Sequence, residues 1–270
     1  MGIITRVIGI VSGKGGVGKT TVAINLAATL ARFDKDVLIV DANLTTSHVG
    51  LYLGMYYFPV TLDMLLAGRK IDVARAIYRH YLGFKILPLS ISLEDVRKAK
   101  MKMFPSIIEK LKPFGKIVLI DSAPGFGKES IASIEASDEL LIVANPDIAC
   151  VNEIKKIVEI SKKLRKKILG VVLNRVKFNP FELSKREIEI ETGCKVIGII
   201  PENDIFKKAL FLKTPAVELD PRGEIAIRFS EICNKIFKTP KIYGPEGLFE
   251  IFVEHLKSFL LSSLSLIRRR

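Results

Sequence analysis

The segment from Val11 to Thr21 places four glycines, two lysines and two threonines in one short loop. Gly13 to Thr20 complete the spacing G-x-x-x-x-G-K-[ST], in which successive backbone N–H groups point inward at phosphate oxygens. In this pattern Lys19 reaches the β- and γ-phosphates, and the Thr20 hydroxyl is a ligand for Mg²⁺. The residues expected to hold the phosphates are Gly13, Gly15, Gly16, Val17, Gly18, Lys19, Thr20 and Thr21. The loop therefore predicts a bound nucleoside triphosphate.

The residues on either side of this loop support the same interpretation. Arg6 to Val11 form a short apolar run that is typical of a buried strand, and residues 21–31 have the apolar spacing of an amphipathic helix. The positive end of that helix would face the phosphates. The alternative is a glycine-rich turn that spells the motif by chance, and the order of strand, loop and helix disfavours it.

Carboxylates end two further apolar runs. Asp41 follows residues 38–40, and Asp121 follows residues 117–120. Because Mg²⁺ bound to phosphates is held by one or two acidic residues, both are candidate metal ligands together with Thr20, and Asp121 is the Walker B candidate. Gly125 is expected to bring its backbone amide near the γ-phosphate. The alternative for each aspartate is that it caps the following helix.

Short apolar runs alternate with helical patterns along the chain, as expected of right-handed βαβ units and a parallel sheet. The expected strands are Val7–Ser12, Asp36–Asp41, Phe84–Leu89, Lys116–Asp121, Glu139–Ala144, Ile168–Asn174 and Lys195–Ile200. The predicted fold class is α/β, with a single doubly wound, mostly parallel sheet of about seven or eight strands flanked by helices. Ligands bind beyond the carboxyl ends of such strands, where Asp41, Asp121, Asn174 and Pro201 with Glu202 are expected to converge.

The length and composition of the chain indicate how it is divided into domains. Its 270 residues are 49% hydrophobic, which is enough for one large domain. Turn formers near Thr239–Pro245 predict a domain over 1–238, a linker over 239–245 and a tail over 246–270.

The three cysteines have no metal-like spacing, and the first strand begins too early for a signal peptide, so we expect a reduced, cytoplasmic protein. The net charge of +13 favours anionic partners, either nucleic acid or acidic lipid.

The tail has the pattern of an amphipathic helix. Its apolar side chains recur at three- and four-residue steps, with polar side chains opposite. The apolar positions are Phe249, Phe252, Val253, Leu256, Leu260, Leu264 and Ile267, and three arginines end the chain. Two interpretations stay open: the tail lies on an anionic membrane, or it docks on its own domain or on a partner. Glu250 and Glu254 weaken the attraction to acidic lipid.

The motifs together resemble the deviant Walker A ATPases of the MinD/ParA group, and the MinD branch most closely. The resemblance rests on residues 13–21 with the extra Lys14, on residues 40–43 and on residues 120–125, and it extends from about Arg6 to Phe237. It implies a P-loop ATPase fold that binds ATP or ADP with Mg²⁺. It also implies an ATP-dependent homodimer in which Lys14 of each subunit reaches the partner's phosphates.

The same resemblance assigns roles to further residues. The family usually has an Asp-x-Asp pair where this chain has Asp41-Ala42-Asn43. An amide cannot accept a proton as a carboxylate does, but it can orient an attacking water, so we expect slow hydrolysis. Asn174 and Arg175 lie where the family binds the adenine base, and so do Pro201 and Glu202. Asn174 is expected to hydrogen-bond the base while the Pro201 segment packs on it.

Two functions of different classes follow from these residues. The first is an ATP-switched positioning protein, cytoplasmic and reversibly membrane-peripheral, whose dimer pairs two weak tail anchors. An activating or cargo protein is a further expected partner. The alternative is a ParA-like partitioning ATPase that binds DNA non-specifically through basic residues between Lys155 and Lys167. A solvated helix face is the favoured interpretation of those lysines, because aromatic residues are not interleaved with them.

Overall fold

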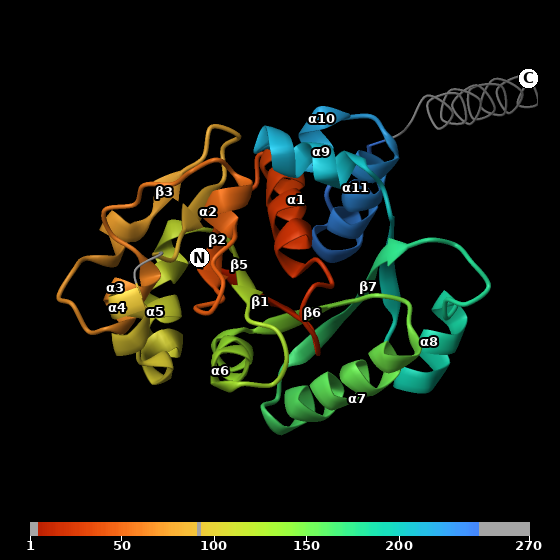
Figure 1. The fold of residues 1–270 in the computed structure, drawn as a ribbon, viewed down its shortest axis with the longest axis horizontal. Coiled ribbons are helices and arrows are strands. Elements are labelled where there is room, and N and C mark those ends of the chain that lie inside the picture. The colour runs from red at the N-terminus through yellow and green to blue at the C-terminus, as the bar shows by residue number, and fades with distance from the viewer. Residues whose placement is uncertain (1–4, 91–92, 243–270) are drawn as a thin grey trace, which may run out of the picture.

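One eight-stranded sheet forms the centre of the molecule, in the strand order β3-β4-β2-β5-β1-β6-β7-β8 (Figure 1). The computed structural model describes residues 5–90 and 93–242. All neighbouring strands are parallel except β3 and β4. The strands are β1 Arg6–Val11, β2 Val37–Ala42, β3 Tyr78–Arg79, β4 Lys85–Leu87, β5 Ile117–Ser122, β6 Glu139–Ala144, β7 Lys167–Val176 and β8 Val196–Pro201. The sheet is therefore doubly wound and mostly parallel, as predicted.

Helices cover both faces of this sheet. The α-helices are α1 Lys19–Arg32, α2 Val49–Tyr52, α3 Leu62–Leu66, α4 Leu93–Lys98, α5 Phe104–Leu111, α6 Lys128–Ala136, α7 Ile148–Lys163, α8 Lys185–Thr192, α9 Ile205–Leu212, α10 Ala216–Leu219 and α11 Glu224–Phe237. Short 3₁₀ helices are η1 Val73–Ala76, η2 Met101–Met103 and η3 Lys112–Phe114. Helices α1 and α11 pack on one face, whereas α5, α6 and α7 lie on the other (Figure 1).

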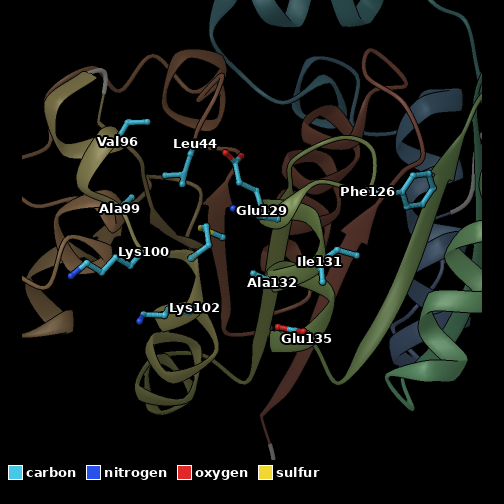
Figure 2. A pocket seen from close by; sticks show the side chains of 12 residues that line it. Leu44, Val96, Ala99, Lys100, Lys102, Phe126, Glu129, Ile131, Ala132 and Glu135 are labelled. Atoms are coloured by element: carbon cyan, nitrogen blue, oxygen red, sulfur yellow. The ribbon is translucent and has the colours of Figure 1, made fainter.

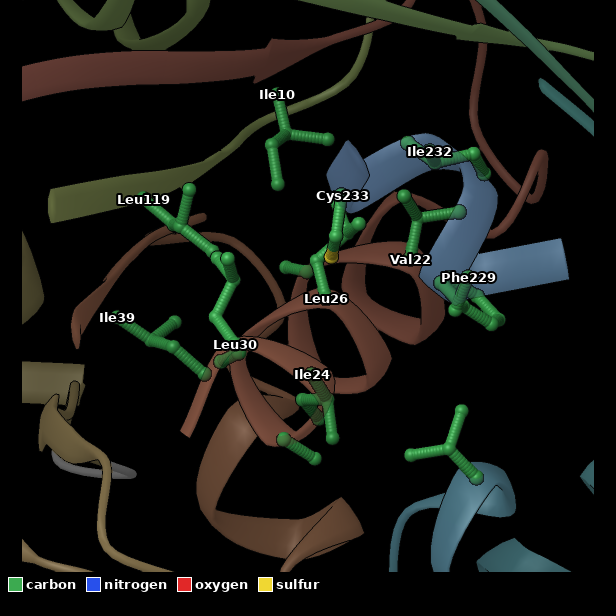
Figure 3. Packing of buried hydrophobic residues seen from close by; sticks show 14 of the residues in the cluster. Ile10, Val22, Ile24, Leu26, Leu30, Ile39, Leu119, Phe229, Ile232 and Cys233 are labelled. Atoms are coloured by element: carbon green, nitrogen blue, oxygen red, sulfur yellow. The ribbon is translucent and has the colours of Figure 1, made fainter. Parts of the chain in front are cut away.

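Burial on both faces explains why the strands are nearly continuous apolar runs. Every residue of β2, β5 and β6 is buried, as is usual in parallel sheets covered by helices. On the α1 face, Leu26 and Leu30 of α1 pack with Phe229, Ile232 and Cys233 of α11 in one fully buried cluster (Figure 3). This cluster fixes α1, and with it the loop at the start of α1, against the sheet.

The predicted strands all occur: Glu139–Ala144 matches β6 at both ends, and the others have shifted ends. Ser12 lies outside β1, and only Lys85–Leu87 of the expected run 84–89 pairs as a strand. The sequence analysis missed β3, which has two residues and pairs antiparallel with β4 at the sheet edge. Such a short strand is held by its neighbour and carries no alternation of its own, so the sequence offered no signal for it. The helix predicted over 21–31 spans Lys19–Arg32.

The described chain ends beyond α11. Lys238 takes a left-handed conformation with φ of 57°, which ends that helix. The backbone N–H of Ile242 then donates to Ser230 Oγ at 2.6 Å. The predicted tail over 246–270 lies outside the described residues, and the domain boundary after residue 238 stays a prediction. Within residues 5–90 and 93–242, no helix has the length and apolar character needed to cross a membrane.

Candidate functional site

The predicted polar residues meet at the carboxyl edge of the central strands. Asp41 of β2 and Asp121 of β5 are direct neighbours in register. Strand β1 pairs with β5 on its other side and leads into the loop of residues 12–20, called here the phosphate loop. Asp41, Asn43 and Asp121 are called here the acidic rim. The order of strands in the sheet thus places the phosphate loop beside two buried carboxylates, at the edge where ligands bind in open α/β sheets.

Two glycines in the phosphate loop occupy positions where a side chain would not fit, and a third lies in open space with a positive φ. Gly18 has φ of 95°, and a Cβ there would lie 2.2 Å from Asn174 Nδ2. At Gly13 a Cβ would lie 2.4 Å from the Cβ of Glu153 on α7. Gly16 has φ of 79° and nothing within 4 Å of the position of its Cβ. The loop is therefore bare at Gly16 and tightly packed at its two ends, which suits a backbone cradle for an anion.

Lys19 lies inside this loop. It begins α1, its side chain is buried, and its Nζ donates to Ser12 Oγ at 2.8 Å. Burial lowers the pKa of the Lys19 ammonium, and the nearby Asp121 charge opposes that shift. The Ser12 hydroxyl in turn donates to the Lys14 carbonyl at 2.7 Å. The ammonium is thus held at the start of α1, where backbone N–H groups also favour a negative ligand.

Lys14 lies in the same loop but extends in a different direction. Its Nζ donates to Asp147 Oδ2 at 2.5 Å and lies 4.0 Å from Glu153 Oε1. The hydrogen bond to Asp147 is the main cause of a raised pKa for the Lys14 ammonium. Asp147 also caps α7, because its Oδ1 accepts from the Cys150 N–H at 3.1 Å. One aspartate therefore ties the loop lysine to the start of α7.

Asp121 connects the acidic rim to the phosphate loop. Its Oδ2 accepts from the Thr20 hydroxyl at 2.6 Å, while its Oδ1 is buried without a hydrogen-bond partner among the described residues. Burial, followed by the charge of Asp41, raises the pKa of Asp121 to about 7. A buried carboxylate oxygen without a donor has an uncompensated desolvation cost. Thr20 and Asp121 therefore present oxygen ligands at one point, as a hard divalent cation requires.

Asp41 makes different contacts. Its Oδ2 accepts from the Ser47 hydroxyl at 2.9 Å and from the backbone N–H groups of His48 and Val49 at 3.2 and 3.3 Å. Its Oδ1 accepts from the Asn43 N–H at 3.2 Å. Asp41 thus holds the start of α2, which is the capping alternative considered above. Burial raises the pKa of this carboxyl in spite of these hydrogen bonds. The roles of Asp41 in metal binding and catalysis stay predictions.

Asn43 and Gly125 lie on the two loops that follow β2 and β5. Asn43 is buried; its Nδ2 donates to Thr46 Oγ1 at 2.9 Å, and its Oδ1 has no hydrogen-bond partner in the described part of the chain. Gly125 has φ of 76°, and its N–H donates to the Ser12 carbonyl at 3.0 Å. In this structure Gly125 therefore binds the phosphate loop itself, and its approach to a γ-phosphate remains a prediction.

Asn174 also faces the phosphate loop. It is buried at the end of β7, and its Nδ2 donates to the Val17 carbonyl at 2.7 Å. Since the same nitrogen closes the space beside Gly18, Asn174 holds the end of the loop in this structure. The predicted hydrogen bond to a base would use its Oδ1 or the second N–H of its Nδ2.

Two other residues predicted to bind the base line a cleft of about 400 Å³ beyond β7 and β8. The lining residues are Asn145, Pro146, Asp147, Arg175, Lys177, Asn179, Phe181, Glu182 and Glu202. Arg175 has φ of 57° and is exposed, whereas Pro201 is buried and pairs with Val176 of β7. The volume is in the range of small-molecule pockets. The cleft shares Asp147 with Lys14, so it adjoins the phosphate loop.

A larger, mainly apolar cleft of about 810 Å³ lies on the other side of the acidic rim, between α4 with η2 and α6 (Figure 2). Leu44, which follows Asn43, and Phe126, which follows Gly125, both line it. Glu129 lines it as well and accepts from the Thr45 hydroxyl at 3.5 Å. This cleft lacks the glycine backbone that phosphates need, so the nucleotide is assigned to the phosphate loop instead.

Sequence reasoning missed three residues that the structure places at the site. Ser12 binds Lys19, Asp147 binds Lys14, and Glu129 connects the loops after β2 and β5. Ser12 is the last residue of the strand predicted over Val7–Ser12, and that prediction gives it no role at the site. Asp147 did carry a local signal, since it directly precedes α7 and is a favoured N-cap residue. Glu129 had none, because its contact joins positions 84 residues apart.

A glycine loop between a parallel strand and a helix N-terminus, facing a buried Thr–Asp pair, defines an α/β nucleotide-binding protein of the phosphate-loop class. A model of the "CobQ/CobB/MinD/ParA nucleotide binding domain" matches residues 8–215, and the chain belongs to this family. An uncharacterized ATP-binding protein of Methanocaldococcus jannaschii is 38% identical over 229 residues, which cover 85% of this chain and 86% of that protein.

Solved structures agree with this assignment. The cell division ATPase MinD of Pyrococcus furiosus is similar with a TM-score of 0.83 and 33% identity, covering 87% of this chain and 99% of that one. The septum site-determining protein MinD of Pyrococcus horikoshii, solved as a complex with Mg-ADP, has a TM-score of 0.83 and 32% identity and covers 87% and 97%. The fold is that of a MinD-like phosphate-loop ATPase, and the chain is an ATPase of the MinD/ParA family.

Proposed function

We propose that this protein is a slow ATPase that dimerises with ATP, associates with a membrane or a partner protein, and so positions a cellular structure. The observation that carries the proposal is the separation of two loop lysines. Lys19 Nζ is buried against Ser12, whereas Lys14 extends to Asp147 on α7. Lys19 lies inside the loop, where it would contact the phosphates of a nucleotide bound to its own chain. Lys14, whose side chain is 32% exposed, is therefore the candidate for contacting the phosphates of a second subunit.

The residues of the site fit ATP or ADP with Mg²⁺. The phosphate loop offers backbone N–H groups, and Thr20 with Asp121 offers hard oxygen ligands, one of them a buried orphan. The Pyrococcus horikoshii relative carries Mg-ADP. When bound, Mg²⁺ would supply charge neutralisation across the β- and γ-phosphate oxygens. Arg175 and Glu202, in the cleft beside the loop, would contact the nucleoside.

Asn43 supports slow rather than fast hydrolysis. Its buried Oδ1 has no partner among the described residues, so it can accept a hydrogen bond from a water molecule. An amide of this kind orients water but does not take its proton. Asp41 is occupied by donors from the loop that leads into α2. It would act by holding that loop and Asn43 in place.

Membrane association is proposed through the tail, residues 246–270. One weak amphipathic anchor binds a bilayer marginally, and pairing two anchors raises the overall affinity by orders of magnitude. ATP-dependent pairing would thereby make membrane binding reversible, and the protein would alternate between the cytoplasm and the membrane surface.

The contacts of the basic residues between Lys155 and Lys167 favour a solvated surface over the DNA-partitioning alternative. Several lysines of the basic segment are paired with carboxylates: Lys155 with Glu191, Lys163 with Glu159, and Lys167 with Glu139. Pairing of this kind is typical of a solvated helix face.

Sedimentation tests the nucleotide-dependent pairing. Wild type and Lys14→Ala are compared with ADP and with a slowly hydrolysed ATP analogue in magnesium buffer. We expect wild type to sediment as a dimer with the analogue alone, and Lys14→Ala to remain monomeric throughout. A wild-type monomer that binds the analogue by calorimetry would contradict the proposal.

Liposome flotation tests the membrane step separately. Full-length protein and a version ending at Lys238 are each mixed with anionic vesicles, with ATP and with ADP. Flotation is expected only for the full chain with ATP. Equal flotation of all four samples would remove the membrane switch.

A further inference from the structure

An exposed apolar surface lies away from the nucleotide site, where three separate segments meet. We call it the aromatic patch: Leu51, Tyr56, Tyr57, Tyr81, Phe211 and Leu212. Tyr57 is 84% exposed and Phe211 is 83% exposed. Clustered exposed aromatic side chains mark interaction surfaces, whereas single ones need no explanation.

Two contacts show that these segments are neighbours. A Cβ placed on Gly54, which lies between Leu51 and Tyr56, would be 3.0 Å from the Cβ of Lys213. Tyr81 Oη lies 3.3 Å from Thr214 Oγ1. The end of α9 therefore contacts both the loop after α2 and the turn between β3 and β4. The patch is one surface.

Basic side chains border this surface. Lys207 and Lys208 are exposed on α9, and Lys213 directly follows that helix. Asp204 is the acidic neighbour, and it pairs with Lys207 at 2.7 Å. The patch thus combines exposed aromatic rings with a net positive border, and it fits an apolar partner that carries acidic residues.

The chain itself supplies a segment with this chemistry close by. Ile242 is held on Ser230 of α11, α11 packs against α10, and α10 packs against α9 (Figure 1). Helices are about 10 Å across, and six extended residues span about 20 Å. A linker over 243–248 is therefore long enough to bring the following residues onto α9.

The sequence of that segment complements the patch. Phe249, Phe252, Val253 and Leu256 recur at helical spacing, and Glu246, Glu250 and Glu254 lie in the same part of the chain. These three glutamates weaken attraction to acidic lipid, but they match the lysines around α9. The arginines that would suit a membrane come only at 268–270.

We propose that residues 249–257 dock on the aromatic patch of their own chain when no membrane is bound. The apolar stripe of the segment cannot contact the patch and a bilayer at once, so docking competes with membrane association. This proposal rests on the proposed function only in that competition. Docking itself requires neither ATP nor lipid, and it can therefore be tested apart from both.

Zero-length cross-linking with a carbodiimide tests the docking, since this reagent joins lysines to carboxylates that are already in contact. Full-length protein, free of nucleotide and lipid, is treated as a mixture of ¹⁴N and ¹⁵N chains. We expect cross-links from Lys207, Lys208 or Lys213 to Glu250 or Glu254, joining chains of the same isotope. Cross-links only between different isotopes, or none at these lysines, would overturn the proposal.

A pair of matched variants then tests whether the aromatic side chains are needed. Phe211→Ser removes an exposed ring from the patch, and Ile190→Ser removes a 69% exposed apolar side chain from α8. We expect at least a several-fold loss of the cross-link in Phe211→Ser and no change in Ile190→Ser. Equal yields in both variants would overturn the proposal. It would also be overturned if the full chain gave no cross-link and vesicles shielded Lys207 and Lys208 from chemical modification in protein that ends at Ile242, because the patch would then bind lipid and not the tail.

Discussion

The phosphate loop and the acidic rim adjoin each other but differ in how completely their polar groups are satisfied. In the loop, Lys19 has a defined partner, the Val17 carbonyl accepts from Asn174 of β7, and Ser12 links two of the loop residues. In the rim, Asp121 and Asn43 each keep a buried oxygen without a partner among the described residues. The phosphate loop is preorganised by its own hydrogen bonds. The acidic rim keeps a desolvation cost at these two oxygens, which a bound cation and a water molecule could remove.

Removing the Lys19 side chain from the phosphate loop has the largest expected effect on nucleotide binding. Lys19→Ala deletes a buried charge at the start of α1, and we expect ATP affinity to fall by about 100-fold, as for the loss of charged hydrogen bonds. Calorimetry with Mg-ATP measures this. Lys14→Ala is the control at protein concentrations that keep the chain monomeric, and its affinity is expected to stay near that of wild type. Equal losses in both variants would contradict the separation of the two lysines.

Replacing Asp121 tests the rim through pH. Its pKa of about 7 is above the ordinary value of 3.8, so between these values the unfolded chain has lost a proton that the folded chain keeps. The ligand-free protein therefore loses stability as pH rises from about 4 to about 7, and the loss levels off above that. In Asp121→Asn this part of the pH dependence disappears.

The quantity to compare is the free energy of unfolding of Asp121→Asn minus that of wild type. We expect this quantity to be about 2 kcal/mol larger at pH 8 than at pH 5. Urea unfolding without nucleotide measures it, with the exposed Asp204→Asn as a control that should show little change. A difference that is the same at both pH values would mean that Asp121 is ionised throughout.

A substitution in the acidic rim can also increase activity. Asn43→Asp restores the pair of carboxylates that the family usually has, and we expect hydrolysis to rise about tenfold because a carboxylate can accept the proton of an attacking water. Phosphate release at saturating ATP measures the rate. Asn43→Ala, which can do neither, should be slower than wild type. An unchanged rate in Asn43→Asp would mean that residue 43 does not position the water.

The smallest effect is expected at the contact between the loop and α7. Asp147→Asn keeps an N-cap for α7 but removes the charge that holds Lys14. Both side chains are partly exposed, so the free energy of unfolding should fall by less than about 1 kcal/mol. Nucleotide-dependent dimerisation should become a few-fold stronger, because Lys14 no longer has to leave a partner. Weaker dimerisation would show that Asp147 itself belongs to the interface.

Sequence alone predicted the sheet and the phosphate loop because both depend on local requirements. Buried parallel strands need continuous apolar runs, and a backbone cradle needs glycine at fixed positions, as the φ values of Gly16 and Gly18 show. Asp41 and Asp121 are each the next-to-last residue of a strand, and they lie side by side in register. The short edge strand β3 escaped prediction because its only support is β4.

Tertiary structure decided which groups meet. Lys14 and Asp147 are 133 positions apart in the chain, and Asn174 lies 157 positions from the Val17 carbonyl that it binds. The aromatic patch likewise combines residues of three segments whose types say nothing about each other. Motifs fix what a residue can do through its own backbone and chemistry, but its partners depend on how helices pack across the sheet, and no local pattern encodes that packing.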